Sequence, residues 1–254
     1  MIDFNNLPSP LLAALVTGIA FLYASIGFGG ATGYLAVMSL YGIDPNVMAS
    51  SALGLNVIVA GISFSSYARA GHFRKDLALP FLLTSVPAAF IGGYFKVHED
   101  LYFLLLYAVL TYVTLNMLFA RNKSEEGTDL RAIPTWLALV SGALIGLLSG
   151  VVGIGGGIFL SPLIILAGWG TPKQAAATSA AFIVLNSLSG LVGRLTGGNL
   201  VFGWFGAALI PLGALGALAG SYLGARYLPG VWLRRILGVV LLIAVGGYWL
   251  GRLK

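Results

Sequence analysis

The sequence predicts a polytopic all-α membrane protein made of two homologous halves, each with four apolar segments. Composition is the first observation: of 254 residues, 58% are hydrophobic and 9% are charged, against roughly a quarter charged in soluble domains. The second observation is that the apolar residues form eight long segments. The third is that a set of motifs in the first half recurs in the second half. A soluble protein is excluded. Nucleic-acid binding is not expected either, because the charges stand singly between apolar stretches instead of clustering on one face.

Eight apolar segments are long enough to cross a bilayer, whose hydrocarbon core of about 30 Å requires a helix of about 20 residues. They run approximately over Ser9–Tyr41, Asn46–Ala68, Leu77–Phe95, Leu101–Ala120, Trp136–Trp169, Gln174–Gly193, Val201–Arg226 and Val231–Gly251. None has the period-two alternation of a transmembrane barrel. A cleaved signal peptide is not expected, because Met1-Ile2-Asp3-Phe4 carries no Lys or Arg and the apolar run that follows is too long.

The first segment, Ser9–Tyr41, and the fifth, Trp136–Trp169, are too long for a single crossing. Each has about 33 residues, which as one helix would extend about 50 Å. A glycine cluster stands near the middle of each. Two arms of about 15 residues that meet at a glycine turn would form a re-entrant hairpin, entering and leaving by one face. Three crossings then remain per half, and this odd number inverts the second half relative to the first.

The distribution of basic residues gives a second criterion for the topology. With re-entrant hairpins and an external N-terminus, ten Lys and Arg residues face the cytoplasm and four lie outside. If each long segment crosses once and the N-terminus is cytoplasmic, nine Lys and Arg residues face the cytoplasm and five lie outside. Cytoplasmic loops are enriched in Lys and Arg. We therefore expect inverted repeats and keep the single crossing as the alternative.

The two halves share motifs in the same order. Gly27-Phe28-Gly29-Gly30 recurs as Gly153-Ile154-Gly155-Gly156, Pro45 as Pro172, Ser50-Ser51-Ala52 as Thr178-Ser179-Ala180, and Gly71-His72 as Gly198-Asn199. The offsets are 126, 127, 128 and 127 residues. We expect an N-terminal repeat over residues 1–120, a polar linker over 121–135 and a C-terminal repeat over 136–254.

All eight acidic residues fall in predicted loops or at segment ends: Asp3, Asp44, Asp76, Glu99, Asp100, Glu125, Glu126 and Asp129. Cation carriers and proton relays place a carboxylate inside the bundle, so a cation pump is disfavoured. Helices that begin at a glycine turn present free N–H groups and a positive dipole end, which suit an anion. The sequence therefore predicts an anion site at the two glycine turns.

The predicted site combines glycine turns, hydroxyls and amides. Its candidate residues are Gly29, Gly30, Gly33, Ser50, Ser51 and Asn56 in the first half, with Gly155, Gly156, Gly157, Thr178, Ser179 and Asn186 in the second. Asn186 follows Ser179 by seven residues, two turns along one helical face. Asn56 does not keep that spacing from Ser51, so the halves cannot supply identical groups. For any single hydroxyl, bonding to a neighbouring helix or to its own backbone is the alternative.

Other glycines and bases have different predicted roles. Packing between helices is expected for the glycines at four-residue spacing, Gly142, Gly146, Gly150, Gly216, Gly220 and Gly224. Arg69, His72 and Arg194 follow the second segment of each half, where they could draw an anion into a vestibule. The alternative is that these bases anchor helix ends at the interface. No cofactor or metal site is expected, because the chain has two histidines and no cysteine.

The longest motif is Gly153-Ile154-Gly155-Gly156-Gly157-Ile158-Phe159-Leu160-Ser161-Pro162, followed by Pro172, Ala176 and Thr178-Ser179. It resembles the glycine-run, proline and small-residue pattern of the TauE/SafE family of membrane transporters, and the resemblance extends from about Leu11 to Gly251. The first half departs from the pattern, with Ala31 in place of the third glycine and Ala36 in place of the proline.

The resemblance implies a multi-pass protein of the bacterial plasma membrane that moves sulfite, a sulfonate or a related sulfur oxyanion. We therefore expect a transporter of a small anion, working by alternating access between two glycine-broken hairpins, with an anion channel as the alternative. The expected partners are the small anionic substrate and the lipid bilayer, and homo-oligomers are left open. An enzyme is not expected, because an activated serine needs a base at the same depth and both histidines lie near segment ends.

Overall fold

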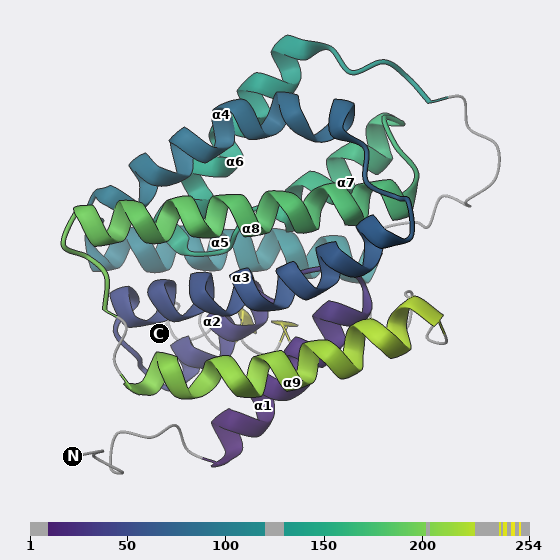
Figure 1. Cartoon of the computed structure of the whole chain (residues 1–254). Coiled ribbons are helices and arrows are strands. Elements are labelled where there is room, and N and C mark those ends of the chain that lie inside the picture. The colour runs from purple at the N-terminus through teal and green to yellow at the C-terminus, as the bar shows by residue number, and fades with distance from the viewer. Residues whose placement is uncertain are drawn as a thin grey trace.

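The computed structural model describes residues 10–119, 130–201 and 204–226, with isolated positions at 239, 241, 242, 245, 246 and 249. Within these residues the fold is all helical. The helices are α1 Pro10–Ser25, α2 Ala31–Leu40, α3 Pro45–Arg69, α4 Lys75–Tyr94, α5 Glu99–Phe119, α6 Thr135–Val152, α7 Gly157–Ala167, α8 Pro172–Thr196 and α9 Trp204–Arg226 (Figure 1). Most of the predicted linker, and the predicted segment Val231–Gly251 as a continuous helix, lie outside the described residues.

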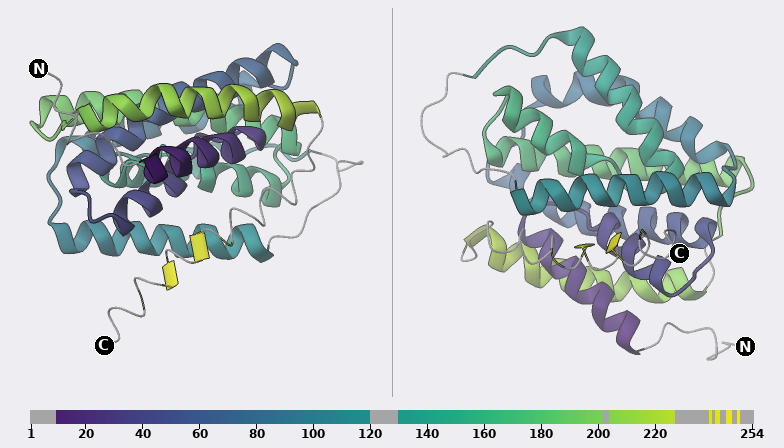
Figure 2. Two further views of the ribbon diagram at one scale, coloured as in Figure 1. Left: turned by 90° about the horizontal axis from the view of Figure 1, so that it is seen from below. Right: turned by 180° about the vertical axis from the view of Figure 1, so that it is seen from behind.

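Helices α3 and α8 form the centre of the molecule and run antiparallel. The first part of α3 meets the end of α8, since a Cβ at Gly190 would lie 3.3 Å from Leu53. At the other end, a Cβ at Gly27 would lie 2.9 Å from Tyr67 of α3 and 3.1 Å from Ala176 of α8. Helix α4 packs on α6 and α8, while α9 packs on α1 and α3. In Figure 1 these two groups lie on opposite sides of the central pair, and Figure 2 shows α5 along the face turned away from that view.

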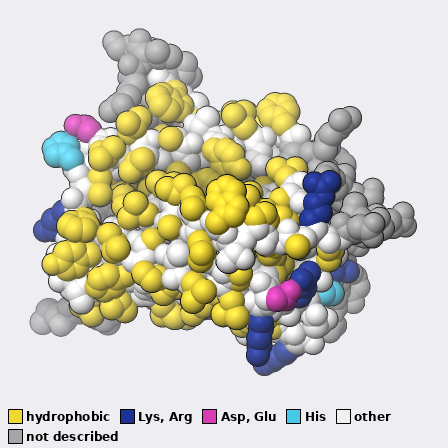
Figure 3. Space-filling model, turned by 90° about the horizontal axis from the view of Figure 1, so that it is seen from above, with side chains coloured by type: hydrophobic (Ala, Val, Ile, Leu, Met, Phe, Trp, Pro, Cys, Tyr) yellow, Lys and Arg dark blue, Asp and Glu magenta, His cyan; other side chains and the backbone are white. Residues whose placement is uncertain are grey.

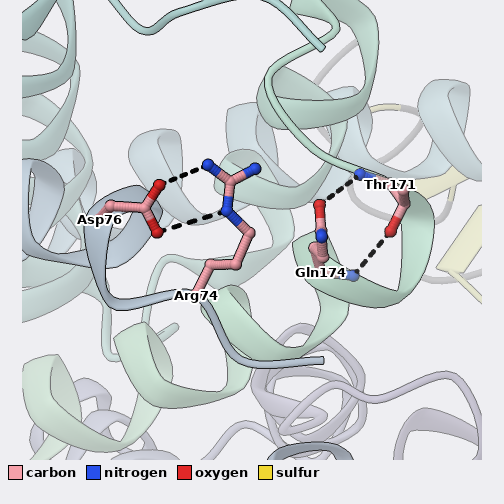
Figure 4. Close-up of polar contacts among 4 residues, drawn as sticks. All are labelled: Arg74, Asp76, Thr171 and Gln174. Carbon is pink, nitrogen blue, oxygen red and sulfur yellow. Dashed lines mark hydrogen bonds and ion pairs between the residues drawn. The ribbon is translucent and has the colours of Figure 1, made fainter. Parts of the chain in front are cut away.

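Both central helices begin at a proline with a side-chain cap. The Asp44 carboxylate accepts the Asn46 N–H at 2.8 Å at the start of α3. Thr171 and Gln174 form a capping box at the start of α8, where their side chains accept each other's backbone N–H groups at 3.3 and 3.0 Å. Near the start of α8, Arg74 pairs with Asp76 at the start of α4 (Figure 4).

Each of the two long apolar segments is broken at its glycines, as predicted. Helix α1 ends at Ser25 and α2 begins at Ala31, with the N-cap Gly30 at a φ of 95°. Helix α6 is followed by Gly153 at a φ of 89°, and the next helix starts at Gly157. Left-handed φ values end a helix at little cost only when glycine occupies the position. The predicted arms of about 15 residues each are wrong in detail, because the arms have 16 and 10 residues in the first half and 18 and 11 in the second.

Glycines at four-residue spacing let helices approach to backbone contact. A Cβ at Gly142, Gly146 or Gly150 of α6 would overlap the backbone of α4 at Phe81, Ser85 and Ala89 respectively. Gly216 and Gly220 of α9 meet the α1 backbone at Thr17 and Phe21 in the same way. The predicted packing role is confirmed for these five glycines. The surroundings of Gly224 are outside the part of the chain that the structure describes.

The surface is suited to lipid. Four of the described helices, α3, α4, α6 and α8, are long and apolar enough to cross a membrane. The outward sides of α4 and α6 carry exposed apolar residues, among them Leu83, Ile91 and Leu144. Figure 3 shows hydrophobic side chains over the face seen from above and charged side chains toward its two ends. The described architecture is that of a polytopic α-helical membrane protein.

Candidate functional site at the two glycine turns

The two glycine turns, more than 100 residues apart in sequence, meet around one side chain. A Cβ added to Gly29 would overlap the Asn56 carboxamide and lie 3.0 Å from Ile183. A Cβ added to Gly155 would lie 2.7 Å from the same carboxamide, 2.8 Å from Ile183 and 3.1 Å from the Ser187 hydroxyl. Asn56 of α3 and Ile183 of α8 therefore lie against both turns. Neither turn could accept a side chain without displacing them.

Most of the polar side chains predicted for the site are buried without a hydrogen-bond partner. This holds for Ser51, Asn56, Thr178, Ser179 and Asn186, and also for Tyr34, Ser85, Ser149 and Ser187, which the sequence had not singled out. Buried polar groups in native proteins are nearly always paired, so these unpaired donors and acceptors are candidates for contact with a polar ligand. Ser50 differs, because its hydroxyl accepts the Val201 N–H at 3.3 Å.

Two helix N-termini start at the turns. The first backbone bonds of α2 run from Gly33 and Tyr34 to the Gly30 carbonyl, and those of α7 run from Phe159 and Leu160 to the Gly156 carbonyl. The N–H groups of the first residues of both helices have no carbonyl in their own helix to bond. Together with the positive ends of two helix dipoles, they give the turns an affinity for negative charge.

The space at the first turn is small. A cavity of about 10 Å³ is lined by Tyr23, Phe28, Gly29, Gly30, Ala31, Thr32, Ile154, Ile158 and Ile183. This is about the volume that one water requires. The lining draws on both halves. In this conformation the turns are therefore in contact, with no room for a multi-atom ligand.

Several predicted glycines pack against neighbours and do not face Asn56. Gly33 lies against Ile19 and Tyr23 of α1, so close packing also accounts for a glycine there, and its place in the binding site stays a prediction. A Cβ at Gly30 would meet Tyr34, and one at Gly156 would meet Ile145 and Phe182. Gly157 comes closest to the site, because its Cβ would meet Ile183 and lie 2.8 Å from the Ser179 carbonyl.

The three predicted vestibule residues do not share one location. Arg69 is the last residue of α3 and His72 follows that helix, near the start of α8, whereas Arg194 lies in the last turn of α8. Arg194 was expected in a loop, but its side chain is buried, 5% exposed, and donates to the carbonyls of Gly150 and Val151 at 3.2 and 2.7 Å. Helix α8 continues to Thr196 because Gly193 and Gly197 allow it to pack closely on α4.

A match to known proteins agrees with this architecture. The sequence matches the family described as "Sulfite exporter TauE/SafE" over residues 11–248. The chain belongs to this family. It is 35% identical to the "Probable membrane transporter protein y4hK" of Sinorhizobium fredii over 230 residues, which cover 89% of this chain and 92% of that protein.

Two further relatives carry similar descriptions. A "Probable membrane transporter protein" of Haemophilus influenzae is 28% identical over 87% of this chain and 81% of its own length. The "Probable membrane transporter protein YunE" of Bacillus subtilis is 30% identical over 72% of each chain. No solved structure matches the sequence. The chain is thus a multi-pass bacterial-type membrane protein of a transporter family.

The family's glycine run lies at the break between α6 and α7. Gly153 ends the first helix and Gly157 begins the second, so the run supplies the turn itself. In the first half Ala31 is the first residue of α2 and is buried at 3% exposure. The departure from the family pattern therefore leaves the helix break in place and alters a buried contact beside it.

Two residues that contact the glycine turns but were not predicted, Ile183 and Tyr67, could have been found by aligning the halves. At the offset of 127 residues, Asn56 corresponds to Ile183 and Arg194 corresponds to Tyr67. Both pairs lie at the glycine turns: the first against Gly29 and Gly155, the second against Gly27 and the end of α6. One half supplies a polar or charged group where the other supplies an apolar or aromatic one, so the site is asymmetric.

Proposed function

We propose that the chain carries a small oxyanion, sulfite or a sulfonate, across the membrane by alternating access at the two glycine turns. The observation that carries the proposal is the meeting of Gly29 and Gly155 at the Asn56 carboxamide. A site formed by both halves changes shape whenever the halves move relative to each other, as alternating access requires. The family's description names sulfite as cargo.

The donor set favours a weakly held anion. Free N–H groups at two helix starts, the Asn56 amide and nearby hydroxyls can replace the hydration of an oxyanion. None of the acidic residues that the structure describes is buried, so no carboxylate in that part of the chain would repel the anion. Without a permanent countercharge beside Asn56, the anion could leave as well as enter.

Reciprocal packing supports two structurally equivalent halves. The contact of α4 with α6 has its counterpart in α9 with α1, and that of α4 with α8 has its counterpart in α9 with α3. Pro45 and Pro172 both open helices of 25 residues. The equivalent helices α3 and α8 are antiparallel. A twofold axis that superposes one half on the other would therefore lie in the membrane plane, which is the arrangement of inverted repeats.

Two hydrogen bonds support re-entrant hairpins. The Arg131 N–H, before α6, donates to the Gly168 carbonyl, after α7, at 2.9 Å, so the pair of helices begins and ends in one place. In the first half, the Tyr23 and Thr32 hydroxyls bond at 2.6 Å across the α1–α2 turn. A cysteine at Leu11 and one at Tyr41 should then be labelled from the same face of the membrane. Labelling from opposite faces would establish single crossings instead.

Transport in proteoliposomes tests the proposal directly. We expect flux of sulfite and not of potassium through the wild-type chain. Gly155→Leu should lower the flux at least about tenfold, because its side chain displaces Asn56 and the residue has a left-handed φ of 73°. Gly61→Leu is the matched control, since no atom lies within 4 Å of its Cβ position.

The control variant should keep wild-type flux. Unchanged flux in Gly155→Leu would contradict the site, whereas turnover at channel rates or conductance in a planar bilayer would assign a channel on the same scaffold. In this cavity of about 10 Å³, an anion fits only after the halves rearrange. We therefore expect turnover at carrier rates.

A further inference from the structure

A second pocket lies at the end of α8, away from the Asn56 site. Its volume is about 150 Å³, about five times the ~30 Å³ share of one water in the liquid. The lining residues are Asp44, Pro45, Asn46, Phe95, Val97, Glu99, Tyr102, Val151 and Arg194. They come from the starts of α3 and α5, the loop after α4, and the ends of α6 and α8.

Arg194 carries a charge that no carboxylate pairs with in this pocket. The ion pairs among the described residues are Arg74–Asp76 and His98–Asp100, and neither involves Arg194. Both of its hydrogen bonds come from Nη2 and end on backbone carbonyls, while its buried Nε–H has no partner. A buried guanidinium without a carboxylate is costly, and Arg is the side chain best shaped for two-point contact with an oxyanion.

Other charged groups face the pocket only from its mouth. Asp44 and Glu99 line it and are exposed, and Asp44 already accepts two backbone N–H groups as the cap of α3. Lys96 and His98 stand in the neighbouring loop and are exposed as well. Deeper in the pocket, Tyr102 donates to the Val152 carbonyl at 3.2 Å. Arg194 and Tyr102 thus bind the last carbonyls of α6, immediately before the second glycine turn.

We propose that this pocket is an entrance site for a small oxyanion, bound by the Arg194 guanidinium on its way to or from the glycine turns. The inference rests on the proposed function only for the identity of the anion. Its donors are the guanidinium N–H groups that the α6 carbonyls do not engage. The exposed carboxylates at the mouth keep binding weak enough for the anion to pass.

The absence of cysteine from the chain makes a clean test possible. Val97→Cys places one thiol in the pocket lining, and Ala70→Cys places a control thiol on the exposed turn after α3. The purified full chain is treated with anionic and cationic methanethiosulfonate reagents at constant ionic strength, with and without sulfate. Sulfate serves as the probe because sulfite would itself attack the mixed disulfide.

We expect sulfate to slow the anionic reagent at Val97→Cys in a saturable way and to leave Ala70→Cys unaffected. Adding Arg194→Gln should raise the half-protecting sulfate concentration at least about tenfold, with partial recovery in Arg194→Lys, which keeps the charge but not the planar fork. Equal protection in the Arg194→Gln variant, or equal protection at both thiols, would overturn the site.

Two further variants keep the test decisive if Arg194→Gln fails to fold. Tyr102→Phe frees the Val152 carbonyl beside Arg194, which should draw the guanidinium away from the anion and weaken sulfate protection about threefold; unchanged protection would count against the site. Glu99→Gln should strengthen protection by removing a negative charge at the mouth. If it instead weakens protection and destabilises the protein, Glu99 is the internal partner of Arg194 and the proposal is wrong.

Sulfite flux tests the proposed function and sulfate protection tests the entrance site, so either result can be negative without the other. Sulfate protection without sulfite flux overturns transport and keeps the entrance site. Sulfite flux without protection overturns the entrance site alone.

Discussion

At the scale of single residues, the Asn56 carboxamide is the most informative group in the molecule. It is fully buried, it touches both glycine turns, and neither its oxygen nor its nitrogen has a hydrogen-bond partner among the described residues. A buried polar group without a partner costs about 1–3 kcal/mol. Such a cost is typical of functional sites, where stability is lost in favour of binding.

Asn56→Leu should therefore separate stability from transport. Replacing the unpaired amide by an apolar group of similar size should raise the free energy of unfolding by about 1 kcal/mol and abolish sulfite flux. Thermal unfolding and proteoliposome flux measure the two effects. Ser66→Leu, at an exposed position of the same helix, is the control and should change neither. A destabilised Asn56→Leu protein with full flux would contradict the assignment.

At the scale of helices, close packing depends on glycine contacts that cross between the halves. Helix α6 meets α4 at Gly142, Gly146 and Gly150 through backbone carbonyls. Without a hydrophobic driving force between helices in lipid, such close backbone approach is a main source of association. The sequence spacing predicted these contacts, since four-residue repeats of glycine lie on one face of a helix.

Gly146→Ala should be destabilising by about 1–3 kcal/mol, the usual range for overpacking. Its Cβ would overlap the Ser85 backbone, which cannot move without shifting α4. Gly18→Ala in α1 is the matched helical control, because no atom lies within 4 Å of its Cβ position. That change should stabilise by about 0.5–1 kcal/mol, the helix preference for Ala over Gly. Equal melting temperatures for the two variants would argue against tight α4–α6 packing.

At the scale of the whole molecule, charge divides between the two ends of the bundle. Among the described residues, one end of the bundle carries five bases. Arg69, Arg74, Lys75 and Lys173 lie at the end of α3 and the starts of α4 and α8, and Arg131 bonds through its backbone to Gly168 after α7; Asp76 is the acidic residue described beside them. The opposite end, where the Arg194 pocket opens, carries Asp44, Glu99 and Asp100 with Lys96. The positive-inside rule assigns the basic end to the cytoplasm.

Cysteine labelling of intact cells checks this orientation. Tyr41→Cys, at the acidic end, should react with an impermeant reagent added outside. Ala70→Cys, at the basic end, should react only after the membrane is opened. The reverse pattern would invert the molecule, and with it place the Arg194 pocket on the cytoplasmic side.

Local features of the sequence were sufficient for much of the architecture. Glycine runs end helices wherever left-handed backbone is needed, so Gly30 and Gly153 mark the breaks whatever packs around them. The prediction of two arms of about 15 residues in each hairpin was wrong because the second arm ends early. It stops at the turns that contain Gly42 and Gly168, which lead into the prolines that begin α3 and α8. Most hydroxyls and amides of the proposed site were also named from sequence, but Tyr34, Ser85, Ser149 and Ser187 were not.

The sequence by itself determined the membrane class, the helix breaks and the packing glycines, because each follows from composition or from spacing within one helix. Only the tertiary structure decided that Asn56 faces both turns, that Gly33 packs on α1, and that Arg194 is buried in a pocket far from Arg69. These outcomes depend on contacts between different helices, such as that of Asn56 with Gly155, 99 positions further along the chain. No local pattern records which side chain fills the space between two helices once they have packed.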